Sequence, residues 1–521
     1  MFKKFPWHTL FFAAYPVLFL YAHNVEIVKS KEIIKPLTLV LLGTAVVAFV
    51  FFLFFKNRIK AGILASITAL LLLSYGLYHE KLHTLSIPFF TGSIRFDYNF
   101  YKWASLGIFC VVVWRLYKTK SDLKNINGLL NIVSLVLISF SFFEIIQYHS
   151  KKHSIQTIQN VPQIIEKENV KTLRPTIYYF VMDAYTRNDV LKEYFNFDNS
   201  AFTDYLKQKG FYLADKSISN YGQTFLSLPS SLNMSYLDSI ANAFGEDFED
   251  RWAINDYLQN NKVLCTLKSQ GYKSVAFDAA MFDVVFLTSV DKFINTPGTE
   301  FSMFSVELLN NSILTAFKDK KQKAKTIGNP EDFHRKKILN AFEKIEMLSK
   351  SDKPHFVHAH VLAPHQPFLF DENGNAQEID YSYRIWKPLK PDSDNAEYKK
   401  GYIGQLKFVN KKLMKAIDEI LANKSRPSII IIQGDHGSCS ELRNYLGFEN
   451  NDFKERFSIL NAYYFPDQDY SMLYDSISPV NSFKVVLNKY FDGNYELDED
   501  RAFFSNWDKP YKMYDVTDSI K

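Results

Sequence analysis

The chain has 521 residues, a formal net charge of +5 and a hydrophobic fraction of 47%, so it is long enough for two or three domains. The charge is small for this length and no basic, aromatic-interleaved stripe occurs, so we expect no nucleic-acid partner. Three cysteines exclude a disulfide framework, although a single bridge between Cys265 and Cys439 stays open.

Apolar residues are concentrated in the first 150 residues. They form five segments, at about 7–23, 36–55, 61–78, 100–117 and 128–147. Each is near the length that crosses the hydrocarbon core of a bilayer. The first lacks the small-residue cleavage pattern of a signal peptide and is interpreted as a retained anchor. We therefore predict a domain of about five transmembrane helices over residues 1–150.

The orientation of this predicted domain follows from its basic loops, which favour a cytoplasmic amino terminus. The basic residues on that side are Lys3, Lys4, Lys56, Arg58, Lys60, Arg115, Lys118, Lys120 and Lys124. Five crossings then predict a multi-pass protein of a bacterial cytoplasmic (inner) membrane, with the rest of the chain extracytoplasmic. The alternative is four crossings, with one short segment lying in the interface, which would leave the second domain inside.

Residues 151–174 are predicted to be a juxtamembrane linker, and residues 175–521 a second domain. Short β-branched or aromatic runs alternate here with amphipathic stretches, which indicates a layered α/β domain with a mostly parallel sheet. The expected strands are Thr176–Met182, Ser274–Phe277, Phe356–Val361, Ser428–Gln433 and Leu460–Phe465. The expected helices include Ser200–Lys209, Trp252–Gly271, Arg335–Ser349 and Glu397–Asn423.

The segment Pro427–Gly437 combines a predicted strand with two candidate metal ligands. Its four consecutive isoleucines are typical of a strand buried on both faces, and Asp435 and His436 follow where the strand ends. Ligands of open α/β sheets bind at the carboxyl ends of the strands, and an Asp-His pair there suits zinc or manganese. The alternative is a turn in which both side chains bond only to backbone.

Two further segments offer oxygen ligands and a nucleophile. Asp183 follows the first strand as Asp435 follows the fourth, so the two carboxylates could share a cation, or Asp183 could be a cap. Thr224 follows the chain break at Gly222 at a predicted helix start, where free N–H groups and the helix dipole favour an anion. Thr224 is therefore the candidate nucleophile, Ser227 is a weaker one, and simple helix capping is the alternative.

Histidines cluster in the segment His358–Pro367. His358 and His360 share one face of a strand, whereas His365 lies in a loop bounded by prolines. A core histidine bonded to backbone is the ordinary interpretation of His358, and His365 is the stronger functional candidate. Arg187, Arg384 and Arg456 could contact a phosphate or could be structural.

The order of these motifs resembles the sulfatase-like branch of the alkaline-phosphatase superfamily. It is most similar to membrane-bound phosphoethanolamine transferases and lipoteichoic acid synthases. The resemblance covers residues 175 to about 470, and the five apolar segments fit it too. It is carried by the strand before Asp183, Gly222-Gln223-Thr224-Phe225-Leu226-Ser227-Leu228-Pro229, His360-Val361-Leu362-Ala363-Pro364-His365-Gln366-Pro367, Leu406-Lys407-Phe408-Val409-Asn410 and Asp435-His436-Gly437.

The resemblance implies an alkaline-phosphatase-like α/β fold and a phosphotransferase or hydrolase activity. One divalent ion, zinc or manganese in preference to magnesium or calcium, would be bound by Asp183, Thr224, Asp435 and His436. Thr224 would attack the phosphorus of a membrane phospholipid head group, and His365, with His360, would hold phosphoryl oxygens or protonate the leaving group. The phosphoethanolamine- or phosphoglycerol-type group would then pass to a glycan or lipid acceptor of the cell envelope.

The sequence also departs from this family pattern. Asp183 stands where those transferases carry Glu, and Tyr445-Leu446-Gly447-Phe448 lacks their later His, so we expect no second metal ion. No Cys-x-Pro-x-Arg segment occurs, so the formylglycine chemistry of true sulfatases is not expected. Two other hypotheses stay open: a phosphodiesterase or sulfate esterase of the cell envelope that uses water as acceptor, and a degenerate domain that only binds.

Overall fold

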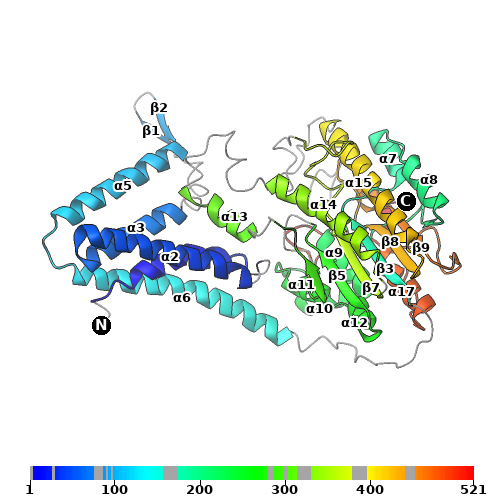
Figure 1. The fold of residues 1–521 in the computed structure, drawn as a ribbon, viewed down its shortest axis with the longest axis horizontal. Coiled ribbons are helices and arrows are strands. Elements are labelled where there is room, and N and C mark those ends of the chain that lie inside the picture. The colour runs from blue at the N-terminus through cyan, green and yellow to red at the C-terminus, as the bar shows by residue number, and fades with distance from the viewer. Residues whose placement is uncertain are drawn as a thin grey trace. The chain divides into compact units, whose positions relative to one another are not determined.

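The computed structural model describes residues 4–25, 28, 30–74, 86–89, 92–95, 98–155, 174–279, 287–297, 303–313, 330–351, 353–377, 396–440 and 452–520. The chain divides into two compact units (Figure 1). Unit 1 comprises residues 1–159 and 300–329, and unit 2 comprises residues 160–299 and 330–521. The domain boundaries proposed at residues 150 and 174 stay a prediction.

Unit 1 is helical. Its long helices follow the predicted apolar segments and are α1 (His8–Ala22), α2 (Ser30–Phe55), α3 (Arg58–Leu73), α5 (Tyr98–Lys118) and α6 (Lys124–Ile155). The end of the third segment, at residues 75–78, lies outside the described residues. A short hairpin pairs β1 (Ser86–Phe89) with β2 (Gly92–Arg95). Two stretches, Glu32–Phe55 and Lys124–Ser150, are long and apolar enough to cross a membrane.

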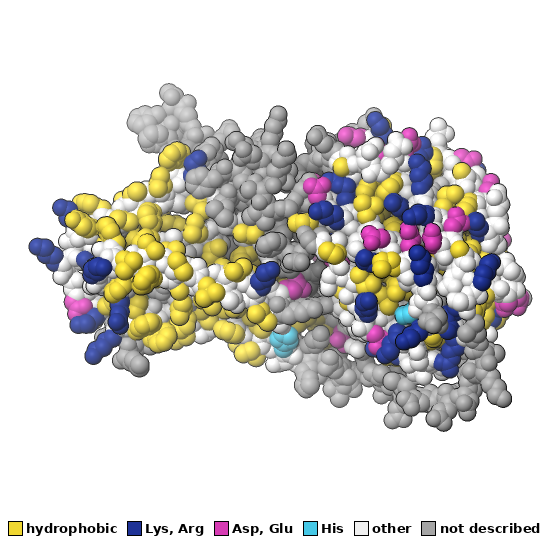
Figure 2. Space-filling view, viewed as in Figure 1, with side chains coloured by type: hydrophobic (Ala, Val, Ile, Leu, Met, Phe, Trp, Pro, Cys, Tyr) yellow, Lys and Arg dark blue, Asp and Glu magenta, His cyan; other side chains and the backbone are white. Residues whose placement is uncertain are grey.

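Large apolar side chains are exposed along the helices of unit 1. Leu42 on α2, Trp103 on α5 and Phe140 on α6 are each 60–62% exposed, and Figure 2 shows apolar side chains over much of this unit's visible face. Exposed apolar surface of this extent marks an interaction with membrane or protein. The number of helices that cross a membrane stays a prediction.

Unit 1 includes a second segment of the chain, residues 300–329, which follows residues 160–299 of unit 2 in sequence. Helix α13 (Met303–Asn310) buries Phe304 and Leu308 in one apolar cluster with Val17 and Tyr21 of α1. Nothing in the sequence pattern predicted that this segment belongs to unit 1.

Unit 2 is built on a seven-stranded sheet in the order β4-β9-β8-β3-β7-β5-β6. Strands β8, β3, β7, β5 and β6 are parallel, and β9 runs antiparallel to β8. The predicted mostly parallel α/β fold is therefore confirmed. The strands are β3 (Thr176–Met182), β4 (Tyr212–Leu213), β5 (Lys273–Phe277), β6 (Lys292–Ile294), β7 (His355–Val361), β8 (Ser428–Gly434) and β9 (Asn461–Tyr464).

The central strands are buried on both faces. In β8, Ile430 and Ile432 contribute to one apolar core, whereas Ile429 and Ile431 contribute to the other. Each fully buried isoleucine side chain stabilises the fold by about 1.5–3 kcal/mol relative to exposure. This explains the isoleucine run, because neither face of the strand meets water.

Helices cover both faces of this sheet, which makes unit 2 a three-layer α/β/α domain (Figure 1). The first face packs against α7 (Asn188–Phe195), α8 (Ser200–Gln208), α14 (Pro330–Leu348) and α15 (Ala396–Ala422). The second packs against α9 (Thr224–Asn233), α11 (Trp252–Gln259), α12 (Lys262–Ser269) and α17 (Pro479–Tyr490). The remaining elements are α10 (Asp238–Phe244), α16 (Phe453–Phe457), a short β10–β11 pair (Phe503–Phe504, Tyr514–Asp515) and a 3₁₀ turn at Thr517–Ser519.

One predicted helix is wrong in its extent. The stretch Trp252–Gly271 forms two helices, α11 and α12, rather than one. Asn261 starts the second helix, because its side chain accepts a hydrogen bond from the Leu264 N–H at 2.8 Å. An asparagine in this position is a strong helix start signal.

Candidate active site

Predicted site residues lie at the carboxyl ends of three adjacent parallel strands, at one edge of the sheet. Met182 of β3 is in register with Val361 of β7 and with Gly434 of β8. The residues that directly follow β3 and β8, Asp183 and Asp435, therefore emerge side by side. This is the carboxyl edge of the sheet, where ligands of open α/β folds bind.

Asp183 and Asp435 are both buried here. Asp183 Oδ2 lies 3.1 Å from His360 Nε2, and Asp183 Oδ1 lies 3.5 Å from His436 Nε2. Asp435 Oδ2 lies 3.5 Å from the same His436 nitrogen. Asp435 Oδ1 instead accepts hydrogen bonds from the N–H groups of Ala184 at 3.1 Å and His436 at 3.0 Å. Each carboxylate thus keeps one oxygen for the centre of the cluster.

Thr224 is the first residue of α9, and Gln223 precedes the helix without a side-chain cap. Thr224 Oγ1 lies 3.3 Å from His436 Nε2, so the helix start reaches the cluster of acids and histidines. Ser227, the weaker nucleophile candidate, is buried one turn further along, and its hydroxyl has no hydrogen-bond partner among the described residues.

His365 lies in the loop after β7 and faces the same cluster. Its backbone N–H donates to Asp183 O at 3.0 Å, and its ring centre is 5.9 Å from that of His436. The Gln405 amide donates to His365 O at 2.8 Å and fixes the loop. His358 is two residues before His360 on β7 and is packed beside Tyr179 and not in the cluster, with ring centres 5.6 Å apart.

Electrostatics in the cluster favour a cation. The pKa of Asp435 is raised to about 7, mainly by burial and secondly by the negative charge of Asp183. Burial also acts to raise the pKa of Asp183, but the neighbouring His365 and the hydrogen bond from His360 hold it below its usual value. Two buried carboxylates this close repel each other unless positive charge lies between them.

The donor set fits a divalent metal ion. Ligand atoms of Asp183, His365 and His436, and likewise those of Asp183, His360 and Asp435, all lie within 4.8 Å of one another. Asp183 Oδ1 and Asp435 Oδ2 are buried without a hydrogen-bond partner in the described part of the chain. Buried polar atoms are normally paired, so these two oxygens are suited to binding a cation. Mixed carboxylate and imidazole ligands suit zinc or manganese.

Two further buried groups lie near the cluster: Arg456, which the sequence offered as a possible phosphate contact, and His334, which the sequence did not single out. Arg456 of α16 donates through Nε to Gly222 O at 2.8 Å and through Nη1 to Gly437 O at 3.1 Å. His334 of α14 is buried, and neither ring nitrogen has a partner among the described residues. The sequence could not choose between a phosphate contact and a structural role for Arg456, and it carried no signal for His334, because the contacts of both residues are distant in sequence. Arg187 is paired with Asp189, and Arg384 lies outside the described residues.

Cys265 and Cys439 are free, so the bridge left open by the sequence is not formed.

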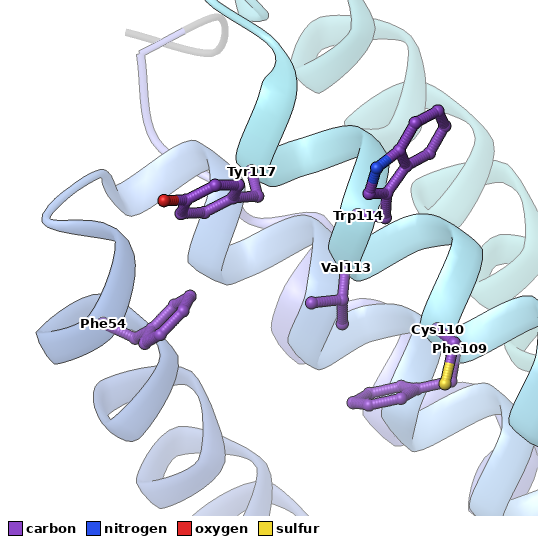
Figure 3. Close-up of a pocket in the computed structure, with 6 residues that line it drawn as sticks. All are labelled: Phe54, Phe109, Cys110, Val113, Trp114 and Tyr117. Carbon is purple, nitrogen blue, oxygen red and sulfur yellow. The ribbon is translucent and has the colours of Figure 1, made fainter.

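A separate apolar groove lies on unit 1 (Figure 3), with a volume of about 360 Å³. Its lining comes from α2 and α5 and consists of Phe54, Phe109, Cys110, Val113, Trp114 and Tyr117. None of these lining side chains is a carboxylate, a histidine or a basic group, so this groove is distinct from the buried cluster of acids and histidines.

Many solved structures match this chain at low identity, and three of them serve as examples. One is the C-terminal periplasmic domain of EcEptC from Escherichia coli in complex with Zn (14% identity, TM-score 0.43, 67% of this chain and 94% of that chain). Another is the integral membrane protein lipooligosaccharide phosphoethanolamine transferase A from Neisseria meningitidis (13%, 0.40, 93% and 95%). The third is the phosphonate monoester hydrolase of Agrobacterium radiobacter (13%, 0.42, 64% and 80%).

A search of curated proteins finds no significant match. The sequence model of the sulfatase family, in contrast, matches residues 175–476, which is more than half of the chain. That match spans β3, α9, β7 and β8, the elements that carry the buried cluster. The chain therefore belongs to the sulfatase family of enzymes.

Proposed function

We propose that this enzyme transfers a phosphorylated head group from a membrane phospholipid to a cell-envelope glycan or lipid through a phospho-Thr224 adduct. The observation that carries the proposal is the position of Thr224, whose Oγ1 lies 3.3 Å from His436 Nε2 at the start of α9. A hydroxyl at a helix start, beside two buried carboxylates with free oxygens, suits nucleophilic attack on an anionic group.

Asp183, Thr224, Asp435 and His436 would hold one divalent metal ion, with zinc or manganese favoured over magnesium or calcium. When bound, such an ion lowers the pKa of a coordinated hydroxyl and offsets negative charge on phosphoryl oxygens. His360, 3.1 Å from Asp183, fixes the orientation of that carboxylate.

The chemistry then follows from the residues of the chain. Thr224 Oγ gives its proton to solvent and forms a bond to phosphorus, while the bond between phosphorus and the diacylglycerol oxygen breaks. Protonated His365 would donate its proton to that oxygen, so that diacylglycerol leaves. An acceptor hydroxyl then gives its proton back to His365 as its oxygen bonds to phosphorus, and the Thr224–phosphorus bond breaks, which leaves Thr224 deprotonated for the next turnover. Removing one electrostatic contact of this kind typically raises a barrier by about 2.7–4 kcal/mol.

The lipid donor is proposed because of unit 1. Its helices α2, α5 and α6 expose large apolar side chains, and two of its stretches are long enough to span a bilayer. We propose five crossings in a bacterial cytoplasmic membrane, with the amino terminus inside and unit 2 outside, where envelope acceptors are available. Each part of this topology rests on helix length, apolarity and the basic loops.

A hydrolase is the second candidate, and it is favoured by the match to the sulfatase family. Water would then discharge the adduct in place of an acceptor hydroxyl. Purified zinc-loaded protein, incubated with phospholipid labelled in the head group, distinguishes the two. A transferase leaves the label on the protein until lipid or glycan acceptor is added, whereas a hydrolase releases it without acceptor.

Substitution of the nucleophile tests both versions. Thr224→Ala should abolish turnover, because no other hydroxyl is placed 3.3 Å from His436 Nε2 in the described residues. Thr266→Ala, a half-buried threonine on α12, is the matched control and should keep parental turnover. Full activity of the Thr224→Ala protein would rule out the proposed mechanism.

A further inference from the structure

We infer that Arg456 is a phosphoryl-binding residue of this enzyme, and that its guanidinium contacts an oxygen of the group that Thr224 takes up. This inference rests on the proposed function but extends it. The proposed metal ligands and catalytic residues are carboxylates, histidines and a threonine, and none of them carries a permanent positive charge.

Arg456 lies between the two segments that form the reactive cluster. Its Nε donates to the carbonyl of Gly222, two residues before Thr224, at 2.8 Å. Its Nη1 donates at 3.1 Å to the carbonyl of Gly437, which also accepts from His436 Nδ1 at 2.9 Å. The guanidinium and the His436 ring therefore share one acceptor, and the far side of that ring lies 3.3 Å from Thr224 Oγ1.

The charge of Arg456 has no protein counterion. The residue is 6% exposed, and no carboxylate lies within ion-pair distance of it in the described part of the chain. Other buried basic groups of unit 2 differ, since Lys337 is paired with Asp278 at 2.7 Å. A buried charge is normally paired, and leaving one unpaired lowers stability. Retention of an unpaired guanidinium beside a nucleophile indicates that an anion completes the site.

One nitrogen of the guanidinium, Nη2, is still available to bind a ligand. Nε and Nη1 are occupied by backbone carbonyls, while Nη2 has no hydrogen-bond partner among the described residues. A guanidinium fixed at two nitrogens holds the third in a defined direction, and arginine is well suited to phosphate recognition. The positive charge of Arg456 also acts on the cluster. Burial is the main cause that lowers the pKa values of His436 and His365, and the charge of Arg456 lowers them further.

Binding of inorganic phosphate tests this role separately from catalysis. The experiment uses the full-length, zinc-loaded Thr224→Ala protein in detergent, with titration calorimetry as the readout. Adding Arg456→Gln should weaken phosphate binding at least about tenfold, the typical loss of a charged hydrogen bond. Arg456→Lys, which keeps the charge, should bind phosphate more tightly than Arg456→Gln. Arg187→Lys is the matched control, since Arg187 is already paired with Asp189 and should leave the affinity unchanged.

A phosphate affinity for Arg456→Gln within about twofold of its parent would overturn the inference, as would absence of phosphate binding in the parent. If the Arg456 variants do not fold, a crystal structure of the zinc-loaded Thr224→Ala protein soaked in phosphate decides. A phosphate oxygen within hydrogen-bonding distance of Nη2 supports the inference, and a phosphate bound away from Arg456 contradicts it. Failure of the proposed function is recognised differently, by full turnover in Thr224→Ala.

Discussion

At the scale of single residues, the candidate site is built around two buried carboxylates, those of Asp183 and Asp435. Asp435 Oδ1 is fixed by two backbone N–H groups, which leaves Oδ2 directed at the cluster. Asp183 is fixed in the same way by His360 at one oxygen, while the other stays without a partner in the described residues. This division of each carboxylate into a structural and a free oxygen is what makes the cluster suitable for a metal ion.

We predict that Asp435→Asn lowers the affinity for zinc at least about tenfold, because the amide keeps both backbone hydrogen bonds but lacks the charge. Elemental analysis and zinc titration of the purified protein measure this. Asp189→Asn, which changes an aspartate paired with Arg187, should bind zinc like the parent. Stoichiometric zinc in Asp435→Asn at parental affinity would remove Asp435 from the metal site.

The acid sensitivity of the fold should depend on His334. Burial, followed by the charge of Lys337, lowers the pKa of His334 to about 3. Between that value and the unfolded pKa of about 6.5, the unfolded chain binds more protons, so stability falls as pH falls through this window. The contribution amounts to about 2 kcal/mol at pH 5. His334→Leu should therefore lose less stability than the parent in denaturant unfolding between pH 7 and pH 5, and an unchanged loss would contradict the assignment.

At the scale of secondary-structure elements, the turn after β8 has no spare volume. A Cβ at Gly437 would lie 2.1 Å from Glu455 O and 3.0 Å from Ser458 O. Both neighbours are backbone atoms of the α16 region, which cannot move independently. The glycine is therefore needed to bring Arg456 and His436 together.

Gly437→Ala should lower the free energy of unfolding by at least about 2 kcal/mol, because backbone must shift to admit the methyl group. It should also weaken zinc binding, since His436 precedes the displaced turn. Gly404→Ala on α15 is the control, because its Cβ would meet nothing closer than 3.5 Å. An alanine there should stabilise the helix by about 0.5–1 kcal/mol. Equal unfolding midpoints for the two variants would refute this account of Gly437.

The sequence predicted those elements whose signals are local. Strand β3 was predicted with its observed ends, and the isoleucines of β8 marked a strand because both of its faces are buried. Strands β4 and β6 were missed because runs of two or three residues, such as Tyr212–Leu213, carry no periodicity. Helix α17 was also missed, although Pro479 at its start is a favourable helix signal.

In the candidate site, too, the sequence predicted those residues whose signals are local. Asp183, Asp435 and His436 follow clear strands, and a parallel sheet must bring such strand ends together. Thr224 was inferred from a glycine break and a family resemblance, and the structure places it beside His436. The position of Arg456 was not predictable, since its partners Gly222 and Gly437 are set by long-range packing.

At the scale of the whole molecule, the five apolar segments and the basic loops between them predict a membrane topology. Single cysteines introduced into a cysteine-free background test it with an impermeant thiol reagent on intact cells. Asp247→Cys in unit 2, whose side chain is 88% exposed, should be labelled. Lys120→Cys, exposed between α5 and α6, should be labelled only after lysis. Protection of Asp247→Cys in intact cells would instead favour four crossings.

Helix α13 is the whole-molecule feature that the sequence did not predict. Residues 300–329 lie far from the first 159 residues along the chain, yet they belong to the same compact unit. The contact depends on Phe304 and Leu308 meeting Val17 and Tyr21, and such pairings are not visible in local hydrophobic patterns.

The most direct test of the central claim is mass spectrometry of the peptide that contains Thr224. The zinc-loaded full-length protein is incubated with total bacterial lipid extract, quenched in acid and digested. We predict a mass increase on Thr224 that corresponds to a phosphorylated head group, phosphoethanolamine or phosphoglycerol in type, and its loss when the acceptor is added. An unmodified Thr224 in protein that turns over the same lipid, or an adduct on another residue, would contradict the account.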